Sequence, residues 1–141
     1  MIEKTHLEFR TNAALDRGTE KRPGGRELIQ LLAENMPRHG VAVSAPIEED
    51  WGWCLYATLD RVRAMIACGP YQEYEDGWLA FVEPPKGLRS WFKRGPITSA
   101  CTKIAAAMRD AIRDDGRFRD LRWWTDPAGL GQTEPADRDD R

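Results

Sequence analysis

The sequence predicts an α+β fold: a two-layer sandwich in which a mostly antiparallel sheet carries two helices on one face. Three observations lead to this prediction. Two segments repeat apolar residues at helical spacing, several short segments alternate with a period of two, and glycine- or proline-containing turns separate the segments. Each helix has a single apolar stripe, which one face of a sheet can cover. The expected order of elements is β-α-β-β-β-β-α-β.

The first part of the chain is expected to form a strand, a loop and a helix. Residues 6–9, HLEF, alternate and predict a short strand, whereas residues 11–25 are polar and rich in glycine and predict a long loop. Long loops inside compact domains are often functional. The helix is predicted over 26–36 because its apolar side chains recur at helical spacing, at Leu28, Leu31, Leu32 and Met36.

Strands dominate the middle of the chain. A strand at 41–43 follows the helix, and in 51–59 the odd positions are apolar, which predicts that Trp51 and Trp53 face the core with Leu55. Asp60 and Arg61 form a tight link to a strand at 62–68. A further strand at 78–83, WLAFVE, ends at two prolines, because proline cannot donate to a strand ladder.

The last part of the chain is expected to contain a helix, a strand and a tail. The helix is predicted to be capped by Thr98 or Ser99 and to end at Gly116, with its apolar stripe at Cys101, Ile104, Ala105, Met108 and Ile112. A final strand is predicted over residues 118–124, FRDLRWW. Residues 126–141 are acidic and poor in apolar side chains and predict a disordered tail, so a single α/β domain is expected over 1–125.

Composition restricts the class of protein. The 141 residues carry a net charge of -2, which argues against a general nucleic-acid-binding protein. Cys54, Cys68 and Cys101 are widely spaced, as is usual for buried thiols in a reducing compartment. The sequence shows neither a secretory signal nor an apolar run long enough to span a membrane, so we expect a cytoplasmic protein.

Motifs for catalysis are absent from the sequence. It contains none of the nucleophile-elbow, phosphate-loop, zinc-protease or dinucleotide-binding patterns, and its two histidines and three cysteines lack metal-ligand spacing. We therefore expect no metal and no cofactor, and a non-enzymatic protein is favoured over an enzyme.

Tryptophan is the most informative residue type, with six in the chain. Trp123 and Trp124 are adjacent and should point to opposite faces of their strand, as should Trp78 and Leu79. Apolar residues on both faces leave an aromatic patch on the open face of the sheet, and such patches mark binding sites. The predicted binding residues are Glu48, Glu49, Asp50, Trp51, Trp53, Trp78, Arg122 and Trp124.

Two features have a plainer interpretation beside the functional one. Glu48, Glu49 and Asp50 form either the rim of a binding surface or a solvated turn before a buried strand. Residues 85–96 interleave basic and aromatic side chains, as single-strand nucleic-acid readers do, but the near-neutral net charge favours an ordinary loop whose aromatics tuck into the core.

Three blocks carry a resemblance to a known family. EDWGW at 49–53, GPYQEYEDGWLAFVEP at 69–84 and RDLRWW at 119–124, in this order, resemble a widespread family of small stand-alone bacterial proteins with no assigned function. The resemblance runs from about residue 5 to 124 and implies no catalytic role. By analogy, small acidic α/β proteins without catalytic residues are common among bacterial immunity proteins, which bind and block a toxin.

The leading expectation is therefore a non-enzymatic, cytoplasmic protein-binding domain, with an immunity-type inhibitor of a basic partner as its most concrete form. A small-ligand binder or small hydrolytic enzyme is the alternative, with a carboxylate base and a site between Trp51, Trp53 and the loop at 69–77. A third expectation is a homodimer that pairs through the open face of the sheet.

Overall fold

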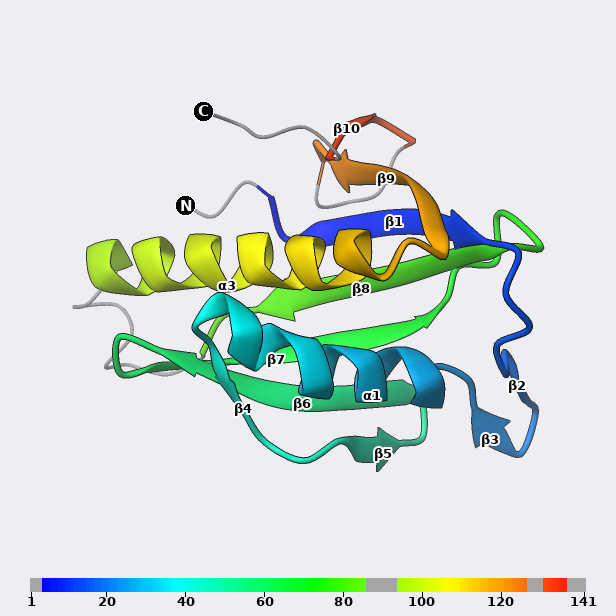
Figure 1. Cartoon of the computed structure of the whole chain (residues 1–141), viewed down its shortest axis with the longest axis horizontal. Helices are drawn as coiled ribbons and strands as arrows, with labels where there is room; N and C mark the ends of the chain where they lie inside the picture. The colour runs from blue at the N-terminus through cyan, green and yellow to red at the C-terminus, as the bar shows by residue number, and fades with distance from the viewer. Residues whose placement is uncertain (1–3, 86–93, 127–130, 137–141) are drawn as a thin grey trace.

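A mostly antiparallel sheet with two helices on one face makes up the fold, as the sequence predicts (Figure 1). The computed structural model describes residues 4–85, 94–126 and 131–136. The strands are β1 (His6–Thr11), β2 (Gly18–Thr19), β3 (Arg22–Pro23), β4 (Ala42–Val43), β5 (Ile47–Glu49), β6 (Gly52–Leu59), β7 (Val62–Pro70), β8 (Gly77–Glu83), β9 (Phe118–Trp124) and β10 (Thr133–Pro135). The helices are α1 (Arg26–Asn35), which continues into a 3-10 turn (Met36–His39), and α3 (Arg94–Asp115).

The order of strands in the main sheet is β10-β9-β1-β8-β7-β6-β4, and β5 pairs with the same edge of β6 as β4 does. All of these pairings are antiparallel. β2 and β3 form a separate small hairpin. One long face of the sheet is covered by α1 and α3, and the other face is open (Figure 1).

The core lies between the helices and the sheet. The apolar stripes expected from the sequence are buried on both helices, at Leu28, Leu31, Leu32 and Met36 and at Cys101, Ile104, Ala105, Met108 and Ile112. The strands present alternate residues to this layer, such as Leu7 and Phe9 of β1. The helical periodicity therefore predicted its side of the core correctly, and the strand periodicity did so except at Trp51, which is exposed.

A two-residue turn joins β6 to β7, although its sequence lacks the favoured glycine. Asp60 and Arg61 both have positive φ angles, of 51° and 65°. Two consecutive residues with positive φ form the turn whose twist matches that of paired strands, which is why the hairpin uses it. The predicted hairpin is confirmed.

The adjacent tryptophans of β9 point to opposite faces of the sheet, as expected. A bulge in β9 is needed to bring its apolar side chains to the buried face. Phe118, Leu121 and Trp123 are all buried, and the step from 118 to 121 breaks the period of two. The register with β1 shifts at this point, and Asp120 has a φ of 56°.

Several boundaries differ from the sequence prediction. The expected loop at 11–25 contains the β2–β3 hairpin. The second helix begins at Arg94 rather than at Thr98 or Ser99, and the Thr98 carbonyl accepts a bond from the Thr102 hydroxyl inside the helix. Proline is tolerated in a first helical turn, so Pro96 does not delay the start of α3. Most of the basic loop, including Trp91 and Phe92, lies outside the described residues.

Part of the expected tail belongs to the sheet. We expected disorder from residue 126, but β10 pairs with β9, and the backbone of Ala136 donates to the Leu121 carbonyl at 2.8 Å. Glu134 forms an ion pair with Lys4 at 3.1 Å, and the Ala136 side chain is fully buried. Strand pairing compensates for the low apolar content that suggested disorder. Residues 127–130 and 137–141 lie outside the described part.

Candidate functional site

Four of the predicted binding residues gather at one end of the sheet. Glu48 and Glu49 belong to β5, and Asp50 and Trp51 form the turn into β6; together we name them the acidic corner. The acidic corner faces the β2–β3 hairpin across a cavity of about 560 Å³, and a third side is lined by Gly69 and Pro70 at the end of β7 and by Gln72 in the turn after it. We name this cavity the hairpin cleft.

Trp51 is the residue on which the prediction of a core position was wrong. It is 56% exposed, because β6 begins at Gly52 and Trp51 lies in the turn before it. The period-two pattern continued by chance into the turn. Trp53, on β6, does pack against the core, and its buried indole N–H has no acceptor in the part of the chain that the structure describes.

The wall opposite the acidic corner depends on two glycines. Gly18 has a φ of 85°, and a Cβ at Gly24 would lie 2.2 Å from the carbonyl carbon of Arg17, so the two arms of the hairpin approach more closely than other residues allow. Asp16 secures this hairpin: it accepts the Gly18 N–H at 2.8 Å and pairs with Arg22 at 2.8 Å. These contacts, led by the backbone N–H of Gly18, lower the pKa of Asp16.

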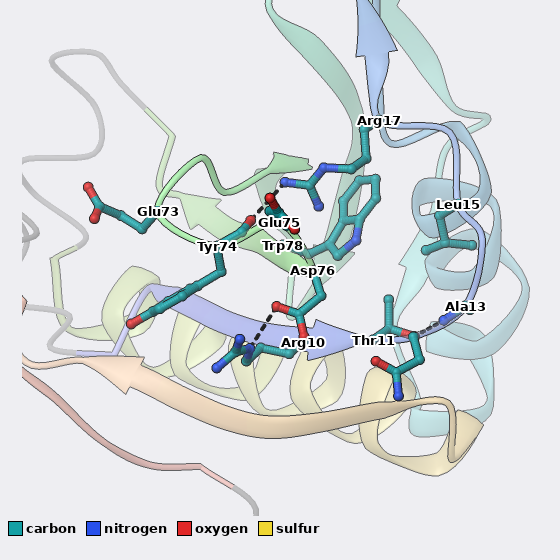
Figure 2. Close-up of a pocket in the computed structure, with 11 residues that line it drawn as sticks. Arg10, Thr11, Ala13, Leu15, Arg17, Glu73, Tyr74, Glu75, Asp76 and Trp78 are labelled. Carbon is teal, nitrogen blue, oxygen red and sulfur yellow. Dashed lines mark hydrogen bonds and ion pairs between the residues drawn. The ribbon is translucent and has the colours of Figure 1, made fainter.

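Arg17 connects the hairpin to the turn between β7 and β8. Its guanidinium donates to the carbonyl of Gly77 at 2.7 Å and to that of Tyr74 at 3.1 Å, and it lies over the ring of Trp78 with Cζ 5.2 Å from the centroid. Arg17 also lines a second cavity, of about 630 Å³, to which Tyr74 and Asp76 of this turn contribute (Figure 2).

Residues of an ion-pair network line the second cavity. Asp76 accepts a bond from Arg10 at 2.8 Å (Figure 2) and a second one from Arg119 at 2.6 Å. These bonds, led by that from Arg10, lower the pKa of Asp76. Trp78, a predicted binding residue, is only 2% exposed and lies at the back of this cavity below Arg17. Trp78 is therefore mainly a core residue.

The acidic corner differs from most acidic side chains of the protein in lacking partners. Within the described residues, the carboxylates of Glu48, Glu49 and Asp50 form neither hydrogen bonds nor ion pairs, although all three are exposed. Glu20 of the hairpin and Glu73 and Glu75 of the β7–β8 turn are also unpaired. Unpaired negative charge is thus concentrated at this end of the molecule.

Arg122 and Trp124, the remaining predicted residues, lie on the open face of the sheet at β9 and outside the hairpin cleft. Arg122 donates to the Thr133 hydroxyl of β10 at 2.6 Å. The indole N–H of Trp124 donates to Glu8 at 3.0 Å. The structure therefore places the predicted residues in separate regions of the molecule and does not bring them together as one surface.

Trp124 belongs to a row of stacked rings that crosses the open face, which we name the aromatic row (Trp124, His6 and Phe81). His6 stacks on Phe81 at 4.8 Å and on Trp124 at 4.9 Å, with interplanar angles of 8° and 11°. Both faces of the imidazole and one face of each neighbour are therefore covered. Burial lowers the pKa of His6, although the charge of Glu83 opposes this shift.

Few side chains have the environment of a catalytic nucleophile or a metal ligand. Cys54, Cys68 and Cys101 are buried, and burial raises the pKa of each thiol. Among the described residues, no group of three or more His, Cys, Asp or Glu side chains is placed to hold a metal ion. None of the described helices is long and apolar enough to cross a membrane.

Comparisons with protein-family models, with curated proteins and with solved structures found no match for this chain. The resemblance based on the EDWGW and RDLRWW blocks stays a prediction. Sequence reasoning did not identify the opposite wall of the cleft, which includes Arg17, Lys21 and Arg22. The signal was the glycine-rich loop at 11–25, whose length alone suggested function but not which residues it would bring to the acidic corner.

Proposed function

We propose that the protein is a non-enzymatic protein-binding domain that docks a basic partner at its acidic corner. The observation that carries this proposal is Trp51, which is 56% exposed beside three carboxylates without described partners, at the rim of the hairpin cleft. Tryptophan is a frequent anchor of protein interfaces, and it is rarely left in water without a function.

The charge of the acidic corner supports a basic partner. Exposed carboxylates that are already paired offer little to a second protein, whereas unpaired ones attract cations at long range and raise association rates. An immunity-type inhibitor that covers a basic toxin, such as a nuclease, is the most concrete form of this proposal, and it rests on analogy with other small acidic α/β proteins.

Affinity capture from host lysate with matched baits tests the proposal. The baits are the wild type, Glu48→Lys and Glu34→Lys, and both variants change the net charge equally. Glu34 is exposed on α1 and has no partner among the described residues, as is true of Glu48. We expect one basic protein to be retained by the wild type and by Glu34→Lys, and to be lost from Glu48→Lys and from the wild type at high salt.

The association and dissociation rates are then measured with the purified protein and its captured partner. Glu48→Lys should lower the association rate about tenfold at low salt, because a rim charge acts mainly on steering. Trp51→Ala should instead raise the dissociation rate, because it removes a buried anchor. Equal retention by the Glu48→Lys and Glu34→Lys baits would contradict the proposal.

A second candidate function is the binding of a small ligand in the hairpin cleft. Its volume of about 560 Å³ falls within the range of small-molecule sites. Trp51, Gly69 and Gln72 line it and belong to the segments expected to form such a site, whereas Trp53 does not line it. A screen of cationic and aromatic fragments, followed by Trp51 fluorescence with Trp51→Phe as the control, tests this function. Saturable quenching that disappears in Trp51→Phe would favour it.

A further inference from the structure

We propose that β5 receives a basic segment of the partner as an added β-strand. This inference rests on the proposed function and specifies how the partner binds. β5 pairs with β6 on one side only, with Ile47 opposite Cys54, Glu48 opposite Trp53 and Glu49 opposite Gly52. Within the described part of the chain, nothing pairs with its other side.

The outer side of β5 is open to solvent. β5 runs along the rim of the sheet beyond β6, away from both helices (Figure 1). All three of its side chains are exposed, including Ile47 at 37%. An unpaired edge presents a row of backbone donors and acceptors, which is the template that an extended peptide uses when it adds to a sheet.

The charges of β5 determine which kind of segment can pair with this edge. A second copy of the chain would bring Glu48 and Glu49 against the same glutamates, and like charges opposite each other destabilise a strand pair. Opposite charges in the same positions stabilise it. The two glutamates therefore disfavour pairing between copies and favour a basic segment, which agrees with their lack of partners within the described residues.

The register of β5 with β6 predicts the pattern of side chains in the partner segment. Ile47 and Glu49 share the face of Cys54 and Gly52, and Glu48 lies on the other face. A strand laid beside β5 therefore needs an apolar residue next to Ile47 and a basic residue next to each glutamate. The expected core of the partner segment is one apolar residue adjoining two basic residues.

A short synthetic peptide tests the inference directly. The probe is the capped hexapeptide Thr-Val-Arg-Arg-Val-Thr, whose side chains read the same in both directions. The matched control carries N-methyl groups on the four central amides, which keeps the charges and side chains but removes the donors that strand pairing requires. We expect the control to bind at least about tenfold more weakly than the probe, by titration calorimetry.

Amide hydrogen exchange supplies a second readout. The probe should slow exchange within residues 47–49, and the N-methylated control should not. Replacing Glu48 and Glu49 by Gln should weaken the probe about threefold to tenfold, whereas Glu34→Gln should leave its affinity unchanged.

Each result has a distinct meaning. Equal binding of the probe and the N-methylated control, with both weakened in the Glu48→Gln/Glu49→Gln variant, would overturn strand addition and leave the proposed function standing. Binding of neither peptide would overturn strand addition by this motif, and the lysate capture would still test the proposed function. A wild-type dimer in sedimentation whose formation slows amide exchange within residues 47–49 would overturn the choice of a basic partner over a second copy.

Discussion

Trp51 and Trp124 both lie next to glutamates and on the surface side of the fold, yet their surroundings differ. Trp124 donates its N–H to Glu8 and stacks on His6, whose other face is covered by Phe81. Trp51 is 56% exposed, and the carboxylates beside it have no described partner. The rings and the indole N–H of the aromatic row already have partners within the chain, whereas the carboxylates of the acidic corner have none among the described residues.

This difference shows that the number of aromatic residues on a surface does not locate a binding site. The aromatic row contains more rings than the acidic corner, but its rings already stack on one another and its indole donor already has an acceptor within the chain. The available interactions are the exposed indole and the unpaired charges at the acidic corner. We therefore expect mutations in the aromatic row to change stability and mutations in the acidic corner to change binding.

The largest expected effect comes from truncating the two tryptophans. Trp124→Ala removes a stacked ring and a hydrogen bond, and we expect it to lower the free energy of unfolding by about 2–3 kcal/mol. Trp51→Ala should change it by less than about 0.5 kcal/mol, because the side chain is largely in water. Urea unfolding of both variants measures the difference, and a similar loss of unfolding free energy in the two variants would contradict this prediction.

A smaller effect separates the adjacent tryptophans of β9. Trp123 is 2% exposed, but its indole N–H has no acceptor among the described residues, whereas the indole N–H of Trp124 donates to Glu8. Trp124→Phe should cost about 1–2 kcal/mol by removing a hydrogen bond to a carboxylate. Trp123→Phe should cost less, since relief of the orphaned donor offsets the small cavity left by the indole.

Unfolding in denaturant ranks these two variants. If Trp123→Phe were the more destabilising, burial would outweigh hydrogen bonding at this strand.

The smallest expected effect is a pH dependence centred on His6. Burial lowers its pKa in the folded state below the ordinary value of 6.5, so the unfolded chain takes up the proton first as the pH falls. The free energy of unfolding should therefore decrease below about pH 6.5 and level off once folded His6 is protonated as well.

The variant His6→Phe isolates this contribution because it keeps a ring in the aromatic row and removes the titration. Its melting temperature should fall less than that of the wild type between pH 7.5 and pH 5. Parallel curves for the two proteins would show that the stacked imidazole titrates in the same way in the folded and unfolded chain.

The sequence by itself determined the layers of this protein. Apolar residues at helical spacing defined the buried stripes of α1 and α3, and alternation defined the buried face of strands such as β1 and β6. These signals are local: whether a side chain can be buried depends on its neighbours three, four or two positions away. The split of Trp123 from Trp124 followed from the same rule.

Only the tertiary structure decided which surface residues have partners. The sequence placed Trp51 on a strand face, but the start of β6 at Gly52 leaves it in an exposed turn. It also left residues 133–136 as tail, although pairing with β9 makes most of them a strand. Ion pairs such as Asp76 with Arg10 and Arg119 join residues far apart in the chain.

The physical reason is the range of the interactions. Burial patterns are set by short-range periodicity, which a sequence displays directly. Charge pairing, ring stacking and the covering of a sheet edge depend on which distant segments meet, and the fold alone decides that. The acidic corner is visible in the sequence as three acids and a tryptophan, but its open edge and its unpaired charges arise from the way β5 and the β2–β3 hairpin lie around the hairpin cleft.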